Sequence, residues 1–166
     1  MMYSLLGWFY EVFLEVVVYQ WGFSNRGFLF GPYLPIYGFG ALTFILSLRK
    51  LKNRKLKVAG INMMPLIIFL GVMVIATLME LAASYIMEAF TGAWLWDYRA
   101  YPFHFDGRIA LNPSIRFGIG GTLFIYFVQP FFEKLVKRLS GFHLHLCFAV
   151  LFITFIVDVV IRIATL

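Results

Sequence analysis

Residues 61–90 read INMMPLIIFLGVMVIATLMELAASYIMEAF, an apolar run whose second half carries Glu80, Ser84 and Glu88. A helix rises about 1.5 Å per residue, so about 20 residues cross the roughly 30 Å hydrocarbon core of a bilayer. The run is therefore long enough to cross a membrane and to protrude or tilt. Its three polar residues are spaced by four and are expected to share one face of the helix.

The whole chain has the composition of a membrane protein. Of its 166 residues, 62% are hydrophobic and only 13% are charged. A soluble domain of this size has too little interior to bury so much apolar surface. We predict an all-α membrane protein with structured outer loops, in which residues 1–166 form a single integral membrane domain. Its five-helix transmembrane bundle would use spans at about residues 3–20, 35–48, 61–90, 115–132 and 142–161.

Basic residues cluster directly after the second and fourth predicted spans, at residues 49–57 and 134–138. By the positive-inside rule, this pattern predicts a cytoplasmic N-terminus, cytoplasmic basic runs and a C-terminus outside, in a multi-pass protein of the plasma membrane. The loops at residues 21–34 and 91–114 then face outward. Because these flanking runs explain most of the net charge of +6, we expect membrane lipids rather than nucleic acid as partners.

The two halves of the chain present similar features in the same order. Residues 1–57 and 62–138 each run from a glutamate-bearing apolar helix through a loop with arginine to a glycine-containing apolar segment and a basic stop. Two parallel two-helix repeats plus a last helix at 142–161 are one interpretation. A coincidence of hydropathy is the other, because residue identity between the halves is weak.

Acidic residues inside apolar spans point to a polar site. A charged side chain at the centre of a span costs about 2.5–3.5 kcal/mol, so three of them approach the roughly 5–15 kcal/mol stability of a domain. We therefore expect Glu11, Glu15 and Glu80 to face the bundle interior, with Arg26 and Arg108 of the outward loops as partners. This predicts a shared pocket in the outer half of the bilayer. Its network either pins loops to helices or binds a substrate, an ion or a lipid headgroup.

Two local features accompany this predicted site. Residues 103–109 alternate around Asp106-Gly107, which is typical of a β-hairpin with a type I′ turn. Asp158 and Arg162 are four residues apart near the outer end of the last span, and we expect them to form a local pair within that helix.

Familiar catalytic and metal-binding patterns do not occur. The sequence contains no GxxxxGK[ST], HExxH or GxSxG motif. His143, His145 and Cys147 make a poor ligand set, because only two of them share a helix face. We therefore expect no metal, no cofactor and no catalytic residues, and we favour a non-enzymatic role.

The run NRGFLFGPYLPIYGFG at residues 25–40 resembles the signature of the CmpB family. The motifs Gly7-Trp8-x-x-Glu11, Trp96-Asp97-Tyr98 and Gly107-Arg108-Ile109 resemble that family too, and the similarity extends to about residue 135. The family groups bacterial membrane proteins, labelled ABC-transporter permeases of type IV, with some animal transmembrane proteins. The resemblance implies a multi-spanning transport protein without catalytic residues to carry over.

The resemblance also narrows the candidate residues and partners. Glu11, Asn25, Arg26, Asp97 and Arg108 match the recurrent polar positions of the family. Together with Glu15 and Glu80 they form our candidate substrate-binding set. A narrow five-helix bundle implies a homo-oligomer or partner subunits, and the label implies a separate ATPase subunit. An intramembrane enzyme acting on a lipid headgroup and a non-catalytic partner or sensor remain alternatives.

Overall fold

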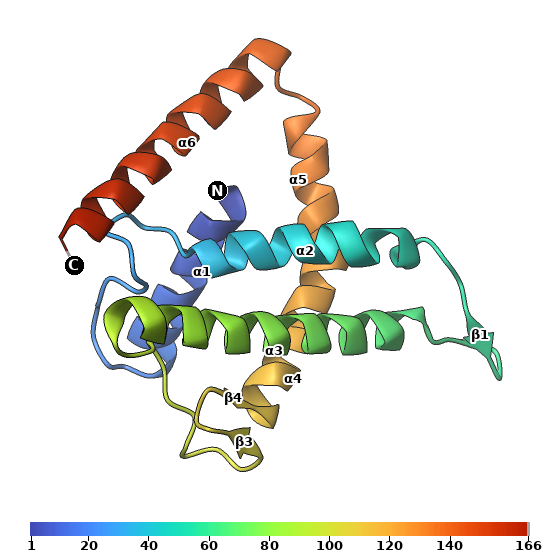
Figure 1. The fold of residues 1–166 in the computed structure, drawn as a ribbon. Coiled ribbons are helices and arrows are strands. Elements are labelled where there is room, and N and C mark those ends of the chain that lie inside the picture. The colour runs from blue at the N-terminus through green and yellow to red at the C-terminus, as the bar shows by residue number, and fades with distance from the viewer. Residues whose placement is uncertain (166) are drawn as a thin grey trace. The chain divides into compact units, whose positions relative to one another are not determined.

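The computed structural model describes residues 1–165, and in that part of the chain five continuous helical segments carry most of the residues (Figure 1). The first is α1 (Met2–Phe13), which continues as a π-helical turn, η1 (Leu14–Val18). The others are α2 (Pro35–Lys52), α3 (Met64–Thr91), the continuous α4 (Leu111–Leu123), η2 (Phe124–Val128) and α5 (Gln129–Val136), and α6 (Gly141–Ala164). Two short antiparallel hairpins pair β1 (Lys57–Val58) with β2 (Ile61–Asn62) and β3 (His104–Phe105) with β4 (Ile109–Ala110).

Three of the helical segments are long and apolar enough to cross a bilayer: Met64–Thr91, Leu111–Val136 and Gly141–Ala164. They correspond to the third, fourth and fifth predicted spans. Only 6% of the apolar stretch of α6 is buried within the protein. Its exposed apolar surface therefore requires an apolar environment. These helices identify a membrane protein.

The first two helical segments are less clear-cut. The α1 and η1 elements comprise 12 and 5 residues, and α2 has 18 residues with Arg49, Lys50 and Lys52 in its last turn. A helix of 18 residues measures about 27 Å, slightly less than the hydrocarbon core. The two spans, the five-helix bundle and the parallel repeats therefore stay predictions. The predicted start of α2 at Pro35 is confirmed.

The start of α3 differs from the sequence-based boundary at residue 61. Val58 and Ile61 are paired across a hairpin, whose turn residues Ala59 and Gly60 have φ values of 51° and 83°. The helix begins only at Met64, whose backbone N–H donates to Asn62 Oδ1 at 3.2 Å. The apolar residue Ile61 thus belongs to a short strand and not to the helix.

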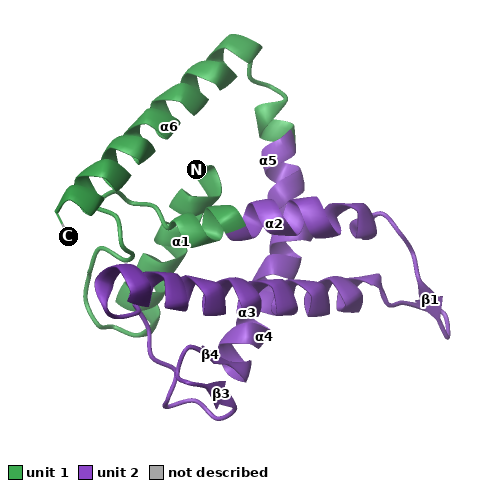
Figure 2. Cartoon of the chain, in the orientation of Figure 1, with its two compact units in different colours: residues 1–39, 134–166 green, residues 40–133 purple. Residues whose placement is uncertain are grey.

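The chain divides into two compact units, and each is described by itself below (Figure 2). Unit 1 comprises Met1–Phe39 and Lys134–Leu166, and unit 2 comprises Gly40–Glu133. This division follows neither the predicted halves, 1–57 and 62–138, nor a cut at a single point in the chain. The single membrane domain stays a prediction.

Close packing in unit 2 joins α3 to α4. The hydrophobic core there consists of Leu48, Met64, Ile68, Val72 and Ile125. A Cβ on Gly118 would lie 2.6 Å from the ring of Phe69, and one on Gly121 would overlap Val72. The two glycines therefore let α4 lie directly against α3, as small residues do in membrane helix pairs. This packed pair supports the loop that connects the two helices.

Candidate functional site

In unit 1 the loop after η1 folds back onto Glu15. This side chain is only 6% exposed and accepts hydrogen bonds from Ser24 Oγ at 2.6 Å and Ser24 N at 3.2 Å. Arg26 Nη1 lies 3.7 Å from Glu15 Oε1. The backbone reverses through Gln20, Gly22 and Gly27, which have positive φ values. The structure thus brings together two predicted site residues, a buried carboxylate and a guanidinium.

The other two candidates in unit 1 are engaged with neighbouring side chains. The hydroxyl of Tyr37 donates to Glu11 Oε1. Trp8 Nε1 donates to Asn25 Oδ1 at 2.8 Å, and Asn25 Nδ2 donates to the carbonyl of Phe30 at 2.8 Å. Glu11 is therefore bonded to a tyrosine, whereas we expected an arginine, and Asn25 shapes the loop.

Asp158 and Arg162, which we expected to form a local pair, interact electrostatically and also contact a loop that is distant in sequence. Asp158 accepts hydrogen bonds from Phe30 N at 3.1 Å, Gly31 N at 2.7 Å and the hydroxyl of Tyr33 at 2.5 Å. The guanidinium carbon of Arg162 lies 4.9 Å from the ring centroid of Phe30. Both side chains therefore connect α6 to the loop at residues 28–33. Burial, and the hydrogen bond to Asp158, raise the pKa of Tyr33, so this loop hydroxyl remains a donor.

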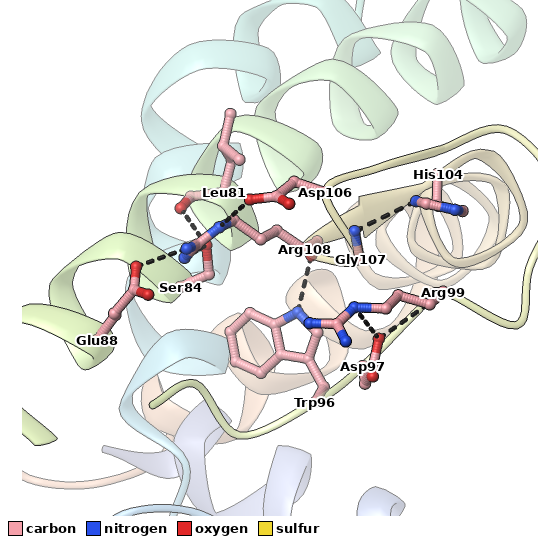
Figure 3. A network of polar contacts seen from close by, with 10 residues as sticks. All are labelled: Leu81, Ser84, Glu88, Trp96, Asp97, Arg99, His104, Asp106, Gly107 and Arg108. Atoms are coloured by element: carbon pink, nitrogen blue, oxygen red, sulfur yellow. Dashed lines mark hydrogen bonds and ion pairs between the residues drawn. The ribbon is translucent and has the colours of Figure 1, made fainter. Parts of the chain in front are cut away.

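In unit 2 a second cluster surrounds Arg108 (Figure 3). This side chain is 5% exposed. Its Nη2 lies 2.5 Å from Glu88 Oε2, its Nε donates to Asp106 Oδ2 at 3.1 Å, and its Nη1 donates to Ser84 Oγ at 3.4 Å. The guanidinium carbon also lies 4.1 Å and 4.0 Å from the ring centroids of Tyr85 and Trp94. We call these residues the Arg108 cluster.

The β3–β4 hairpin places Arg108 in this cluster. Asp106 and Gly107 have φ values of 52° and 68°, and Arg108 N donates to the carbonyl of Phe105 at 3.0 Å. Positive φ at both central positions is what a type I′ turn requires, so the predicted hairpin is confirmed. Trp96 Nε1 donates to the carbonyl of Arg108 at 2.8 Å, which ties the preceding loop to the same turn.

The two remaining candidates have partners other than Arg108. Glu80 is 5% exposed, and the hydroxyl of Tyr98 donates to its Oε1 at 2.6 Å. Asp97 lies on the surface, where its Oδ1 accepts from Arg99 N at 2.9 Å. The acidic partner on α3 that sequence reasoning missed is Glu88. The spacing of Glu80, Ser84 and Glu88 by four was the signal that could have identified it.

A family model described as "Putative ABC-transporter type IV" matches residues 1–163. The chain belongs to this CmpB family. The match continues past residue 135, where the resemblance in the sequence ends, and so includes α6 with Asp158. Searches of the curated proteins and of the solved structures gave no match.

The two candidate arginines of this CmpB-family protein, Arg26 and Arg108, differ in how far their side chains are exposed. Burial alone would lower the pKa of Arg108, but Glu88 and Asp106 outweigh it and the pKa is raised. A buried guanidinium with these partners and two rings is suited to anchoring the loop. The side chain of Arg26, by contrast, is 37% exposed, and its contact with Glu15 is longer than a hydrogen bond. Arg26 is therefore the candidate best placed to exchange its partner.

Gly107→Ala should destabilise the hairpin that carries Arg108. The φ value of Gly107 is 68°, and an added Cβ would lie 2.8 Å from Asp97 Oδ1. A side chain in this conformation costs about 1–2 kcal/mol before any clash is counted. Thermal unfolding of the purified protein in detergent would measure the loss. Gly120→Ala is the control, because a Cβ there meets nothing within 4 Å; equal stability of both variants would contradict the prediction.

Proposed function

We propose that the protein is a membrane transport component and that Arg26 and Glu15 contact its substrate in the outer half of the bilayer. The family description and the three apolar helices support a transport role. The observation that carries the proposal is the asymmetry of the pair. Glu15 is buried and bonded to Ser24, while Arg26 is partly exposed and 3.7 Å away.

This asymmetry allows an anion to take the place of the carboxylate. The 3.7 Å separation and the partial exposure of Arg26 make this ion pair weak, so its separation costs little. Glu15 keeps both hydrogen bonds from Ser24 when Arg26 turns away. The planar guanidinium of Arg26 can bind a carboxylate or phosphate at two points. The proposed substrate is therefore an anionic solute.

The other predicted site residues support this pair in our proposal. Glu11 and Asn25 shape the loop around it, and Glu80, Asp97 and Arg108 order the second loop. That residues of both units meet in one pocket stays a prediction. So do the cytoplasmic N-terminus and basic runs, the location in the plasma membrane and the homo-oligomer. Because the sequence has no P-loop, transport of the ABC type would also require a separate ATPase subunit.

Arg26→Gln should lower uptake of the transported anion by about tenfold or more, because a charged hydrogen bond contributes about 1.5–3 kcal/mol. The measurement is uptake of a panel of labelled anionic solutes by a strain that lacks the gene and is complemented with each variant. Arg26→Lys should retain part of the uptake.

Arg99→Gln is the matched control for this experiment. Arg99 also lies 3.7 Å from an acidic side chain, Asp97, but both residues are largely exposed.

Affinity purification of the cross-linked protein, followed by mass spectrometry, tests for the ATPase. Full uptake with a folded Arg26→Gln protein, or uptake of every solute unchanged by deletion of the gene, would refute the proposal.

A further inference from the structure

A hollow of about 140 Å³ lies in unit 2, between the C-terminal part of α2 and the segment formed by η2 and α5. A cavity needs about 10–15 Å³ to hold a single water molecule. The hollow therefore has room for a phosphate-sized group together with water molecules. It belongs to unit 2, whereas the proposed substrate pair belongs to unit 1. Its lining includes Arg49, Lys52, Ile125, Gln129, Pro130 and Glu133.

The position of Lys52 follows from the π-helical turn. Gln129 N donates to the carbonyl of Phe124, and Pro130 has no N–H to donate to the carbonyl of Ile125. Lys52 Nζ donates to that Ile125 carbonyl at 3.2 Å. An ammonium group has three donors, and this bond uses one of them. The turn thus fixes a cation at the wall of the hollow, where Lys52 Nζ also lies 5.7 Å from the ring centroid of Tyr126 and keeps N–H groups that can bind a ligand.

The second cation in the lining is Arg49. Its Nη2 lies 2.7 Å from Glu133 Oε1, and this oxygen also accepts from Gln129 Nε2 at 3.1 Å. The side chains of Arg49 and Glu133 are 58% and 31% exposed, so the ion pair is weakly stabilising and can be exchanged. Glu133 therefore occupies the place that a competing anion would take.

We propose that this hollow binds the phosphate group of an anionic ligand through Arg49 and Lys52. The surrounding basic run adds Arg54, Lys55 and Lys57, which raises the local concentration of anions. An anionic phospholipid headgroup and free phosphate have this chemistry in common. The apolar side chains of Leu46 on α2 and Phe127 on η2 are 72% and 68% exposed, which suits acyl chains on the same two elements.

The basic residues of α2 also offset the negative end of the helix dipole, and the test must separate this effect from ligand binding. Lys50 provides the matched control. It lies in the same last turn of α2 as Arg49 and Lys52, is exposed, and does not line the hollow. Lys50→Gln removes the same charge from the same helix end.

The experiment measures binding to the purified full-length protein in detergent. The probes are phosphatidic acid, phosphatidylglycerol, phosphatidylcholine and inorganic phosphate, each followed by the shift in melting temperature and by native mass spectrometry. We expect the two anionic lipids to bind more tightly than phosphatidylcholine. Lys52→Gln and Arg49→Gln should each weaken that binding by about tenfold, because each removes a charged hydrogen bond. Lys50→Gln should leave it nearly unchanged, and Glu133→Gln should strengthen it.

The possible outcomes decide the proposal in both directions. Binding of inorganic phosphate with the same dependence on Lys52 would support the site and identify a soluble ligand. Equal losses in Lys50→Gln and Lys52→Gln, or weaker binding in Glu133→Gln, would overturn it, since general charge attraction would then suffice. Absence of binding by any probe would overturn it too. If Lys52→Gln does not fold, Lys52→Arg and Glu133→Gln still distinguish these outcomes.

Discussion

Replacement of Asp158 by alanine should lower the free energy of unfolding by about 3–5 kcal/mol, the typical cost of removing one partner from a buried charged network. The substitution leaves the backbone N–H groups of Phe30 and Gly31 and the hydroxyl of Tyr33 without their acceptor. Each of these donors is partly shielded from water. The loop at residues 28–33 should therefore detach from α6 at a temperature well below that at which the helices unfold.

Thermal unfolding in detergent, combined with limited proteolysis of this loop, would measure the effect. Tyr33→Phe removes one of the three bonds and should cost about 1–2 kcal/mol. Thr154→Ala is the control on α6, because Thr154 donates only to carbonyls of its own helix, those of Val150 and Leu151. If Asp158→Ala melts like the control and its loop resists protease, the connection between α6 and the loop has no energetic importance.

Arg108→Ala should have the second largest effect, a loss of about 2–4 kcal/mol. The charged hydrogen bonds to Glu88 and Asp106 contribute about 1.5–3 kcal/mol in partly buried surroundings, and contact of the cation with Tyr85 and Trp94 adds about 0.5–2 kcal/mol. Glu88 and Asp106 are 40% and 63% exposed, so water can solvate them once Arg108 is removed. This hydration keeps the expected loss below that of Asp158→Ala.

Arg108→Lys should recover little of this stability. A lysine has a compact charge and cannot contact Glu88, Asp106 and Ser84 together, nor stack a planar group over the rings. Tryptophan fluorescence would follow the release of Trp94, and thermal unfolding would give the free energy. Arg99→Ala serves as a control in the same loop, because Arg99 is 64% exposed. Full stability of Arg108→Lys would show that charge alone, without the geometry, orders the loop.

Local patterns in the sequence predicted local structure well. The Asp106-Gly107 pair predicted the hairpin, Pro35 marked the start of α2, and the spacing of Glu80, Ser84 and Glu88 predicted their common face. In each case the cause lies within a few residues: positive φ at a turn, a missing N–H, or the helical period.

Long-range contacts of the candidate site were not predictable in the same way. Asp158 contacts residues that precede it by 125 to 128 positions, whereas its spacing from Arg162 indicated only the local pair. Arg108 has Glu88 as a partner, whereas we expected Glu11, Glu15 or Glu80, because the course of the loop decides which turn of α3 it reaches. The bond between Lys52 and Ile125 depends on a π-helical turn that hydropathy does not indicate.

Unit 1 is assembled from the first and the last parts of the chain, and this has a consequence for biosynthesis. A ribosome releases residues 28–33 long before it makes Asp158, so this loop must wait without its acceptor while the intervening helices are inserted. The early segment is then open to quality-control proteases until Asp158 has been made. If the ribosome stalls or the chain is truncated before α6, the loop at residues 28–33 never obtains its acceptor. We therefore expect proteases to cleave such a chain in this N-terminal loop.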